Sequence, residues 1–242
     1  MVCMARSNPR QRELFRHGGK RRGAGRPPRG ERASERHKRR PKHVPRHPVH
    51  VTLRIADGVG NLRSRHAYHA VREATLSAAR KDDFRIVHMS IQRNHLHLIV
   101  EADTKRALIR GVWGFEISAA RLINGAIGRL TGTRRRGTVF ADRYHARALT
   151  SPRAVRHAIG YVLNNWLHHK EHTAPFARNW KIDPYASSIF FEGWQEREHE
   201  IWCYKPPKGY EPLVVWRPRT WLLKVGWSKY HGLISMRAIP GS

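Results

Sequence analysis

The order of apolar and polar positions along the chain predicts a small antiparallel sheet. Apolar side chains alternate with polar ones over residues 49–55, and a period of two is typical of a strand with one buried face. The alternation returns over residues 84–92 and 95–102, and less regularly over residues 139–150. Only a short polar break at residues 92–94 separates the two middle segments, which are therefore expected to form an antiparallel hairpin.

Three segments have the longer period of an amphipathic helix. Residues 64–80 place alanines at helical spacing, and residues 104–130 are long enough for a helix that is broken or bent near Gly111 and Gly114. A serine followed by a proline starts the third helix, because serine caps a first turn and proline fits the first helical position. This helix is expected to span residues 152–169.

The order of these elements predicts an α+β protein. It is the βαββαβ order of ferredoxin-like folds, an antiparallel sheet, with one more helix added at the end. Two helices then cover one face of the sheet, and the other face is left for a ligand or for the added helix. The main domain is expected to span residues 47–170. Residues 171–242 are rich in Trp and Pro without a clear period, and are expected to pack on the domain as an extension.

The charge of the chain indicates a polyanionic partner. Lys and Arg total 47 against 18 Asp and Glu, a formal charge of +29, and such a surplus repels itself unless a polyanion compensates it. Nucleic acid is the expected class of partner. Residues 1–46 hold sixteen Lys and Arg, three Glu and almost no large apolar side chain, so a disordered basic arm is expected there. Within the arm we expect DNA contacts from Arg21, Arg22 and Arg26, either as a minor-groove hook or as a nonspecific phosphate-binding tail.

Several classes of protein are disfavoured by composition. The two cysteines, Cys3 and Cys203, are far apart and belong to no Cys-x-x-Cys pair, which argues against a disulfide framework and a cysteine zinc site. No apolar run approaches the ~18 residues of a membrane span. We therefore expect a cytoplasmic, nucleoid-associated protein with no membrane partner.

Two histidines share one face of the third predicted strand. Residues two apart in a strand point to the same side, so His95, His97 and Ile99 project together while Leu96 and Leu98 project into the opposite layer. Two imidazoles on one strand can bind one metal ion if a further ligand completes the site. Because the chain holds 17 histidines, the alternative that the pair only lines a polar sheet face stays open.

The last predicted helix carries a tyrosine and an asparagine one turn apart. Tyr161 and Asn165 stand at i and i+4, so they share a helix face. If this helix covers the open sheet face, two imidazoles, an amide oxygen and a phenol meet there. A metal ion at that place would polarise a phosphate, and the phenolate would attack its phosphorus. The alternative for Tyr161 alone is an ordinary tyrosine at a helix border.

Other phosphate chemistries fit the residues less well. A histidine-triad hydrolase needs a third alternating histidine, but position 99 is Ile. A two-histidine phosphoesterase needs two His-x-Thr/Ser strands, and only residues 50–52 provide one. A transposase with three carboxylates and two metal ions is disfavoured because Glu101, Asp103 and Asp142 are the only acids near the expected core.

The combination "NHLHLIVEA" followed some sixty residues later by "YVLNN" resembles the single-tyrosine transposases of the HUH superfamily. The REP-associated branch is the closer match. The resemblance implies that His95, His97 and Asn165 bind Mg²⁺ or Mn²⁺. It also implies that Tyr161 cuts single-stranded DNA, stays on the 5′ phosphate and frees a 3′ hydroxyl. The expected substrate is single-stranded DNA with hairpin ends, and the sequence leaves a homodimer open.

The chain departs from the family pattern at two places. Gln92 and Arg93 stand where the family commonly has Met-Pro, and Trp166 stands where it has the proline of Asn-Pro. Neither change removes a reacting atom. Tyr144 lies in the family's strand before the catalytic helix, which favours a structural or DNA-contacting role. The expected DNA contacts of the main domain are Arg134, Arg135, Arg136 and Arg143.

Two further functions remain as alternatives on the same fold. One is a DNA- or RNA-binding protein that has lost cleavage, although nothing in the residues indicates such a loss. The other is a rolling-circle replication initiator, which is usually larger and often has two tyrosines.

Overall fold

The structure is a computed structural model that describes residues 42–78, 81–196 and 209–241. The contacts within the chain divide it between Arg36 and His37, and all the described residues belong to the second unit. Most of the predicted basic arm, with Arg21, Arg22 and Arg26, lies outside the described residues.

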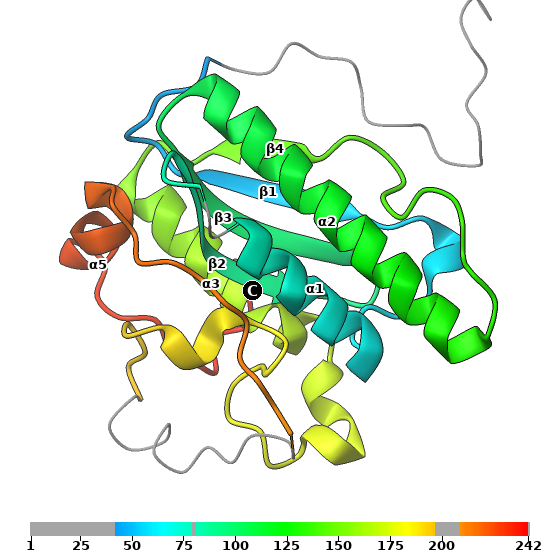
Figure 1. The fold of residues 1–242 in the computed structure, drawn as a ribbon. Coiled ribbons are helices and arrows are strands. Elements are labelled where there is room, and N and C mark those ends of the chain that lie inside the picture. The colour runs from blue at the N-terminus through cyan, green and yellow to red at the C-terminus, as the bar shows by residue number, and fades with distance from the viewer. Residues whose placement is uncertain (1–41, 79–80, 197–208, 242) are drawn as a thin grey trace, which may run out of the picture. The chain divides into compact units, whose positions relative to one another are not determined.

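A four-stranded antiparallel sheet forms the centre of this unit (Figure 1). Its strands in chain order are β1 (Val49–Arg54), β2 (Phe84–Ile91), β3 (His95–Ala102) and β4 (His145–Ala148). The order across the sheet is β2-β3-β1-β4, which places β1 and β3 in the middle. This is the strand order of a ferredoxin-like βαββαβ fold, so the predicted α+β class is confirmed.

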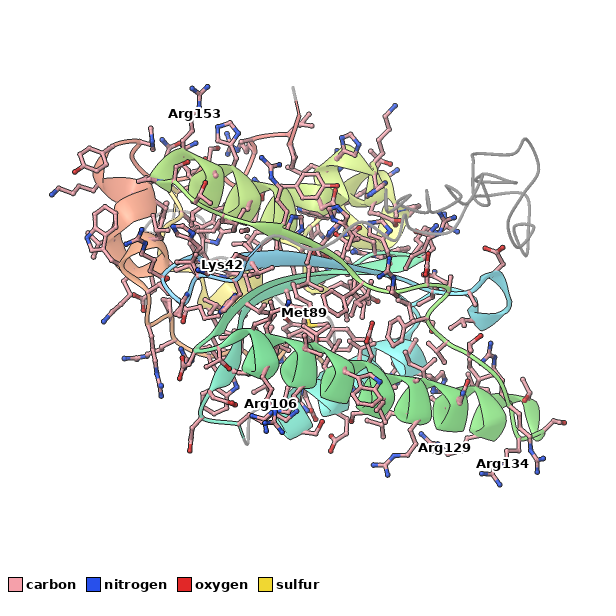
Figure 2. All side chains as sticks on the ribbon, turned by 90° about the horizontal axis from the view of Figure 1, so that it is seen from above. Lys42, Met89, Arg106, Arg129, Arg134 and Arg153 are labelled. Carbon is pink, nitrogen blue, oxygen red and sulfur yellow. The ribbon has the colours of Figure 1, made fainter. Side chains whose placement is uncertain are left out.

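Helices cover both faces of the sheet. On one face, α1 (Arg65–Ala78) and α2 (Lys105–Thr131) pack on the apolar side of β1 and β3, which includes Leu96 and Leu98. On the other face, α3 (Pro152–His168) packs against Ile99 and Val87 in a second apolar cluster. Figure 2 shows α2 and α3 on opposite sides of the strands. The added helix therefore occupies the face that the sequence left open.

Two details differ from the prediction. The helix α2 is continuous through Gly111, where a Cβ atom would lie 2.1 Å from the ring of Phe84, so this glycine allows close packing on β2 rather than a bend. The strand β4 is much shorter than residues 139–150. The carboxylate of Asp142 accepts a hydrogen bond from the backbone N–H of Arg143 at 2.7 Å, and such local bonds compete with strand pairing.

The C-terminal part of the chain packs against both faces of the sheet. Leu213 joins the apolar cluster beneath α1 and α2, and Trp194 and Trp227 join the cluster beneath α3. The remaining helical segments are short: η1 (Asp57–Val59), η2 (Glu171–Thr173), η3 (Pro175–Ala177), η4 (Ser187–Phe190), the π-helical η6 (Leu222–Gly226) and α5 (Trp227–Lys229).

A buried carboxylate attaches this part of the chain to β3. Glu101 is 1% exposed and accepts hydrogen bonds from the backbone N–H groups of Arg219 and Thr220, both at 2.8 Å, and from the Thr220 hydroxyl at 2.7 Å. The guanidinium of Arg85 lies 3.3 Å away. The same carboxylate thus balances a buried cation and holds the segment before η6.

We expect Glu101→Gln to lower the free energy of unfolding by about 3 kcal/mol, because it leaves the buried Arg85 cation without its buried counter-charge. Urea denaturation measures this loss. Asp103→Asn is the matched control, since Asp103 contacts the same guanidinium from an exposed position and should change stability by less than about 1 kcal/mol. Equal losses in the two variants would contradict the role given to Glu101.

Candidate active site

The sheet face beneath α3 is lined with histidines. Strand register places His97 beside Thr52 of β1 on one side and Ser90 of β2 on the other. Thr52 in turn pairs with His145 of β4. Paired residues of neighbouring strands point to the same face, so one polar row crosses the whole sheet under α3.

Both histidines of the His-x-His pair are held through Nδ1. The Nδ1 atom of His95 lies 2.7 Å from the side-chain oxygen of Asn94, which can only accept, so this nitrogen carries the hydrogen. Nδ1 of His97 lies 3.2 Å from the Thr52 hydroxyl and 3.2 Å from Nε2 of His50. The ring centres of His95 and His97 are 4.6 Å apart. In His95 the lone pair is therefore on Nε2. The Nε2 atom of His97 makes no hydrogen bond within the described residues.

The helix α3 is positioned by its cap and by its apolar stripe. The Ser151 hydroxyl accepts from the N–H of Ala154 at 3.2 Å, and Pro152 occupies the first turn. The stripe that docks the helix on the sheet is fully or almost fully buried and consists of Val155, Ile159, Val162 and Trp166. This stripe sets the rotation of the helix over the histidines.

This rotation brings Tyr161 over the histidine face. Its ring centre lies 5.1 Å from that of His97 and 5.9 Å from that of His50. Asn165 follows one turn later and is 0% exposed. Neither its side-chain oxygen nor its nitrogen has a hydrogen-bond partner among the described residues.

The orphaned polar atoms fit a divalent metal ion. The Nε2 atom of His97 is also buried without a partner in the described part of the chain, and such atoms cost free energy unless a ligand satisfies them. Two imidazole nitrogens and an amide oxygen are a mixed nitrogen and oxygen donor set, which can bind a divalent metal ion with further oxygen ligands such as water. Within residues 42–78, 81–196 and 209–241, no three His, Cys, Asp or Glu side chains could hold a metal ion by themselves. A metal at this place would therefore need a donor of another type, and the buried amide oxygen of Asn165 is a candidate.

Burial sets the protonation of the site. Desolvation lowers the pKa of His97 to about 2, with the neighbouring histidines His95 and His50 adding to the effect. Burial likewise lowers the pKa of His95 and of His50 to about 4. The imidazoles are therefore neutral at pH 7, as metal ligands must be. Burial raises the pKa of the Tyr161 phenol, which stays protonated until a cation or a base stabilises the phenolate.

The protein-family comparison decides the family. The model of the family described as "Transposase IS200 like" matches residues 44–165, which is half of the chain. The chain belongs to the IS200-like transposase family. The predicted resemblance to transposases of this type is thereby confirmed at the level of the family.

Among solved structures, the transposase is similar to "Structure of the REP associates tyrosine transposase bound to a REP hairpin". The two chains share 15% sequence identity, and the match covers 78% of this chain and 96% of the other with a TM-score of 0.45. No curated protein matches significantly. None of the helices in the described residues of the transposase is long and apolar enough to cross a membrane.

Three neighbours of the site were not predicted from the sequence of the transposase. His50 and Thr52 belong to the strand-forming alternation of β1, but only the β1–β3 register shows that they support His97. His169 caps α3, and its ring lies 5.7 Å from that of His95. Its spacing in the sequence, one turn beyond Asn165 and two turns beyond Tyr161, indicates the same helix face. A pocket of about 590 Å³ opens beside His95 and His169.

The predicted DNA contacts of the main domain lie in the segment that follows α2. Arg134, Arg136 and Arg143 are exposed. Arg135 is half-buried, and its guanidinium donates to the side chain of Asn124 and to the carbonyl of Thr138. This arginine therefore holds the loop on α2.

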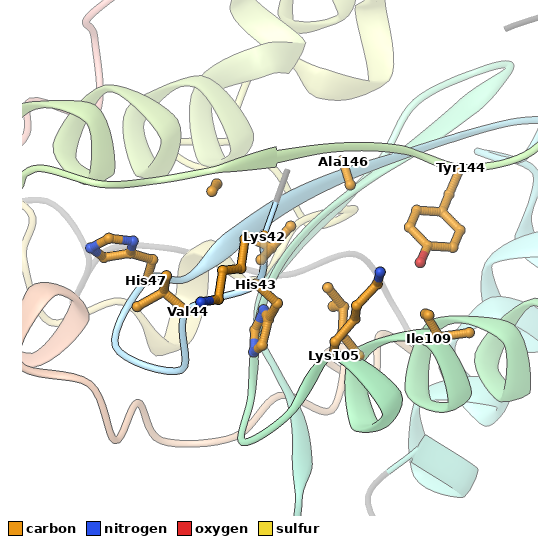
Figure 3. Close-up of a pocket in the computed structure, with 11 residues that line it drawn as sticks. Lys42, His43, Val44, His47, Lys105, Ile109, Tyr144 and Ala146 are labelled. Carbon is orange, nitrogen blue, oxygen red and sulfur yellow. The ribbon is translucent and has the colours of Figure 1, made fainter. Parts of the chain in front are cut away.

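Tyr144 is separated from the histidine face by the sheet. It is buried in the apolar cluster beneath α1 and α2. Figure 3 shows its ring pointing toward α2, near Ile109 and Lys105, where these residues line a small pocket of about 50 Å³. The structural role that the sequence favoured for Tyr144 fits this position, which excludes it from the ring cluster around Tyr161.

The metal-free transposase should lose stability in mild acid. Burial lowers the pKa of His88 in β2 to about 4, whereas an unfolded histidine titrates near 6.5. The stabilising contribution of this neutral ring is complete above about pH 6.5 and is lost as the pH falls toward 4, because the unfolded chain takes up the proton first. The loss from His88 alone is on the order of 3 kcal/mol.

Urea denaturation between pH 7 and pH 4 at constant ionic strength measures this effect. His88→Leu should flatten the curve of unfolding free energy against pH by up to about 1.4 kcal/mol per pH unit. A variant curve as steep as that of the wild type would contradict the buried neutral state of His88.

Proposed function

We propose that this transposase cuts and rejoins single-stranded DNA through a covalent 5′-phosphotyrosine at Tyr161. The observation that carries the proposal is that the Tyr161 phenol lies beside the His97 imidazole, which lies beside that of His95, and that the next turn of the helix holds a buried amide without a partner in the described residues. The family gives the coarser statement, a transposase. The arrangement of these residues supports the finer proposal.

The reaction uses the groups of this chain as follows. His95, His97 and Asn165 would hold Mg²⁺ or Mn²⁺, which supplies charge neutralisation at the phosphate and a lower barrier to nucleophilic attack. The Tyr161 oxygen attacks phosphorus and loses its proton, a new O–P bond forms, and the bond from phosphorus to the 3′ oxygen breaks. The strand then ends in a 3′ hydroxyl, and the 5′ side stays on the enzyme. Attack by a 3′ hydroxyl on the phosphotyrosine reverses these steps and joins DNA.

The substrate proposed is single-stranded DNA next to a hairpin. This is the substrate that the resemblance to the REP-associated branch implies, and the high positive charge of the chain supports a DNA partner. The neutral histidines and the protonated phenol add no negative charge that would repel a phosphate from the α3 face.

A labelled hairpin with single-stranded extensions tests the function. Incubation of the wild-type protein with this DNA and Mn²⁺ should give a protein–DNA adduct that survives a denaturing gel, and a chelator should prevent it. A protein that only binds DNA would shift the same probe in a native gel and leave no adduct. Binding without an adduct, in Mn²⁺ and in Mg²⁺ and with the label on either side of the cut, would favour the non-catalytic alternative and overturn the proposal.

A further inference from the structure

Arginines converge on a pocket on the side of the sheet opposite to α3. The pocket has a volume of about 630 Å³ and lies where α2 meets the loop that follows it. It is lined by Arg121, Asn124, Gly125, Gly128, Arg129, Arg134, Arg135, Arg136 and Gly137. Figure 2 shows Arg129 and Arg134 at this end of α2, on the side turned away from α3.

The lining of this arginine pocket is strongly positive and has no compensating charge. No acidic side chain lines it, and Glu116 is the one acid in the sequence from Lys105 to Gly137. Arg121, Arg129, Arg134 and Arg136 are exposed. Guanidinium groups gathered in this way repel one another unless an anion lies between them, and their forked donors match phosphate oxygens.

Arg135 has a structural role in the same pocket. Its guanidinium donates to the Asn124 side-chain oxygen and to the Thr138 carbonyl, and the Asn124 amide donates to the Gly137 carbonyl at 3.1 Å. Arg135 and Asn124 thus fasten the loop to α2. This fixes where the loop presents Arg134 and Arg136.

The loop also connects the pocket to the end of the sheet that carries the active site. The N–H of Ala141 donates to the carbonyl of Arg54 at 2.9 Å, and Phe140 forms a bridge with Ile55. Arg54 pairs with His95 across β1 and β3. The arginine pocket and the His95 end of the active site are therefore anchored at one end of the sheet, on its two opposite faces.

The chemistry of the lining distinguishes between two forms of DNA. Surfaces for single strands place aromatic rings on which bare bases stack, and no aromatic side chain lines this pocket. A surface of arginines alone suits a backbone whose bases are already paired with each other. We propose that the arginine pocket binds backbone phosphates of the paired stem of the DNA, with Arg135 as a positioning residue. That this stem belongs to the substrate of the enzyme rests on the proposed function.

Fluorescence anisotropy in chelator, where no cutting occurs, tests the pocket. The probes are a hairpin with a single-stranded extension and the extension alone. The double variant Arg121→Ala/Arg129→Ala should bind the hairpin at least about tenfold more weakly, and its slope of log affinity against log salt should fall by about 2. Binding of the extension alone should change less than about twofold.

The control has the same loss of charge elsewhere. Arg106→Ala/Arg153→Ala removes two exposed arginines at the other end of α2 and at the start of α3, as Figure 2 shows. It should change hairpin affinity less than about threefold. Equal losses in the two double variants would mean that only net charge matters, and a loss as large for the extension as for the hairpin would exclude the stem. Either result overturns the proposal.

A double-mutant cycle tests the positioning role. If Arg135 acts through the loop, Arg135→Ala, Asn124→Ala and the combined variant should each weaken hairpin binding by the same factor, because either change releases the loop. Asn124→Ala removes no charge, so a loss there is not an effect of net charge. Losses confined to Arg135→Ala would instead make it a direct phosphate contact. Adduct formation on the extension alone should be unchanged in all these variants. If the wild-type protein forms no adduct, the cutting reaction is refuted. The binding measurements, made without cutting, still test the arginine pocket.

Discussion

Tyr161→Phe should abolish the covalent adduct, with a loss on the order of 10³-fold or more, because no other group of the site replaces a removed nucleophile. The ring itself remains, and it is the ring that lies against His97 and His50. The fold, the affinity for DNA and the affinity for Mn²⁺ should therefore be unchanged. Adduct formation is measured on denaturing gels at saturating DNA.

Tyr144→Phe is the matched control for this prediction. It removes the same hydroxyl from the tyrosine on the other side of the sheet, at a buried position beneath α2. It should keep adduct formation within about threefold of wild type. An adduct that persists in Tyr161→Phe, or that disappears in Tyr144→Phe with the fold intact, would contradict the assignment of the nucleophile.

His97→Ala should weaken Mn²⁺ binding by about 100-fold or more and remove the adduct as a consequence. The side chain is 4% exposed, and its Nε2 atom has no partner in the described residues. Asn165→Leu, which keeps the volume but removes the amide, should weaken the metal in the same way. Calorimetry of Mn²⁺ binding to the DNA-free protein measures both effects without any reaction.

Two further variants separate direct ligands from their support. Thr52→Val removes the hydroxyl that lies 3.2 Å from Nδ1 of His97 and should weaken Mn²⁺ by about tenfold, the size expected when a ligand loses its orienting partner. His157→Ala, one turn before Tyr161 and exposed, should have no effect. Wild-type affinity for Mn²⁺ in both His97→Ala and Asn165→Leu would contradict the metal site.

The hydrophobic pattern predicted most of the fold because strand and helix periods differ clearly in this chain. The expected strand over residues 95–102 is found with the same bounds, since its alternating side chains meet two different apolar layers. The expected break in α2 is wrong, because the helix is continuous through both glycines. A glycine in a helical segment predicts a break. Only the packing of Gly111 against Phe84 shows that a residue without a side chain is required here for close contact.

The site was predictable where one segment carries the information. The spacing of His95 and His97, and of Tyr161 and Asn165, follows from strand and helix periods. The support from Thr52 and His50 was not predictable, because it depends on which residues of β1 lie opposite β3. The role of Arg135 was not predictable for the same reason. Three adjacent arginines look equivalent in sequence, and only the structure shows that the Arg135 guanidinium donates a hydrogen bond to Asn124.

The most direct test of the account is to identify the residue that carries DNA. The adduct formed with Mn²⁺ would be digested with protease and nuclease, and the modified peptide sequenced by mass spectrometry. The account predicts a nucleotide joined through its 5′ phosphate to Tyr161, in the peptide that also contains Asn165. A nucleotide on Tyr144, on any other residue, or joined through a 3′ phosphate would contradict it.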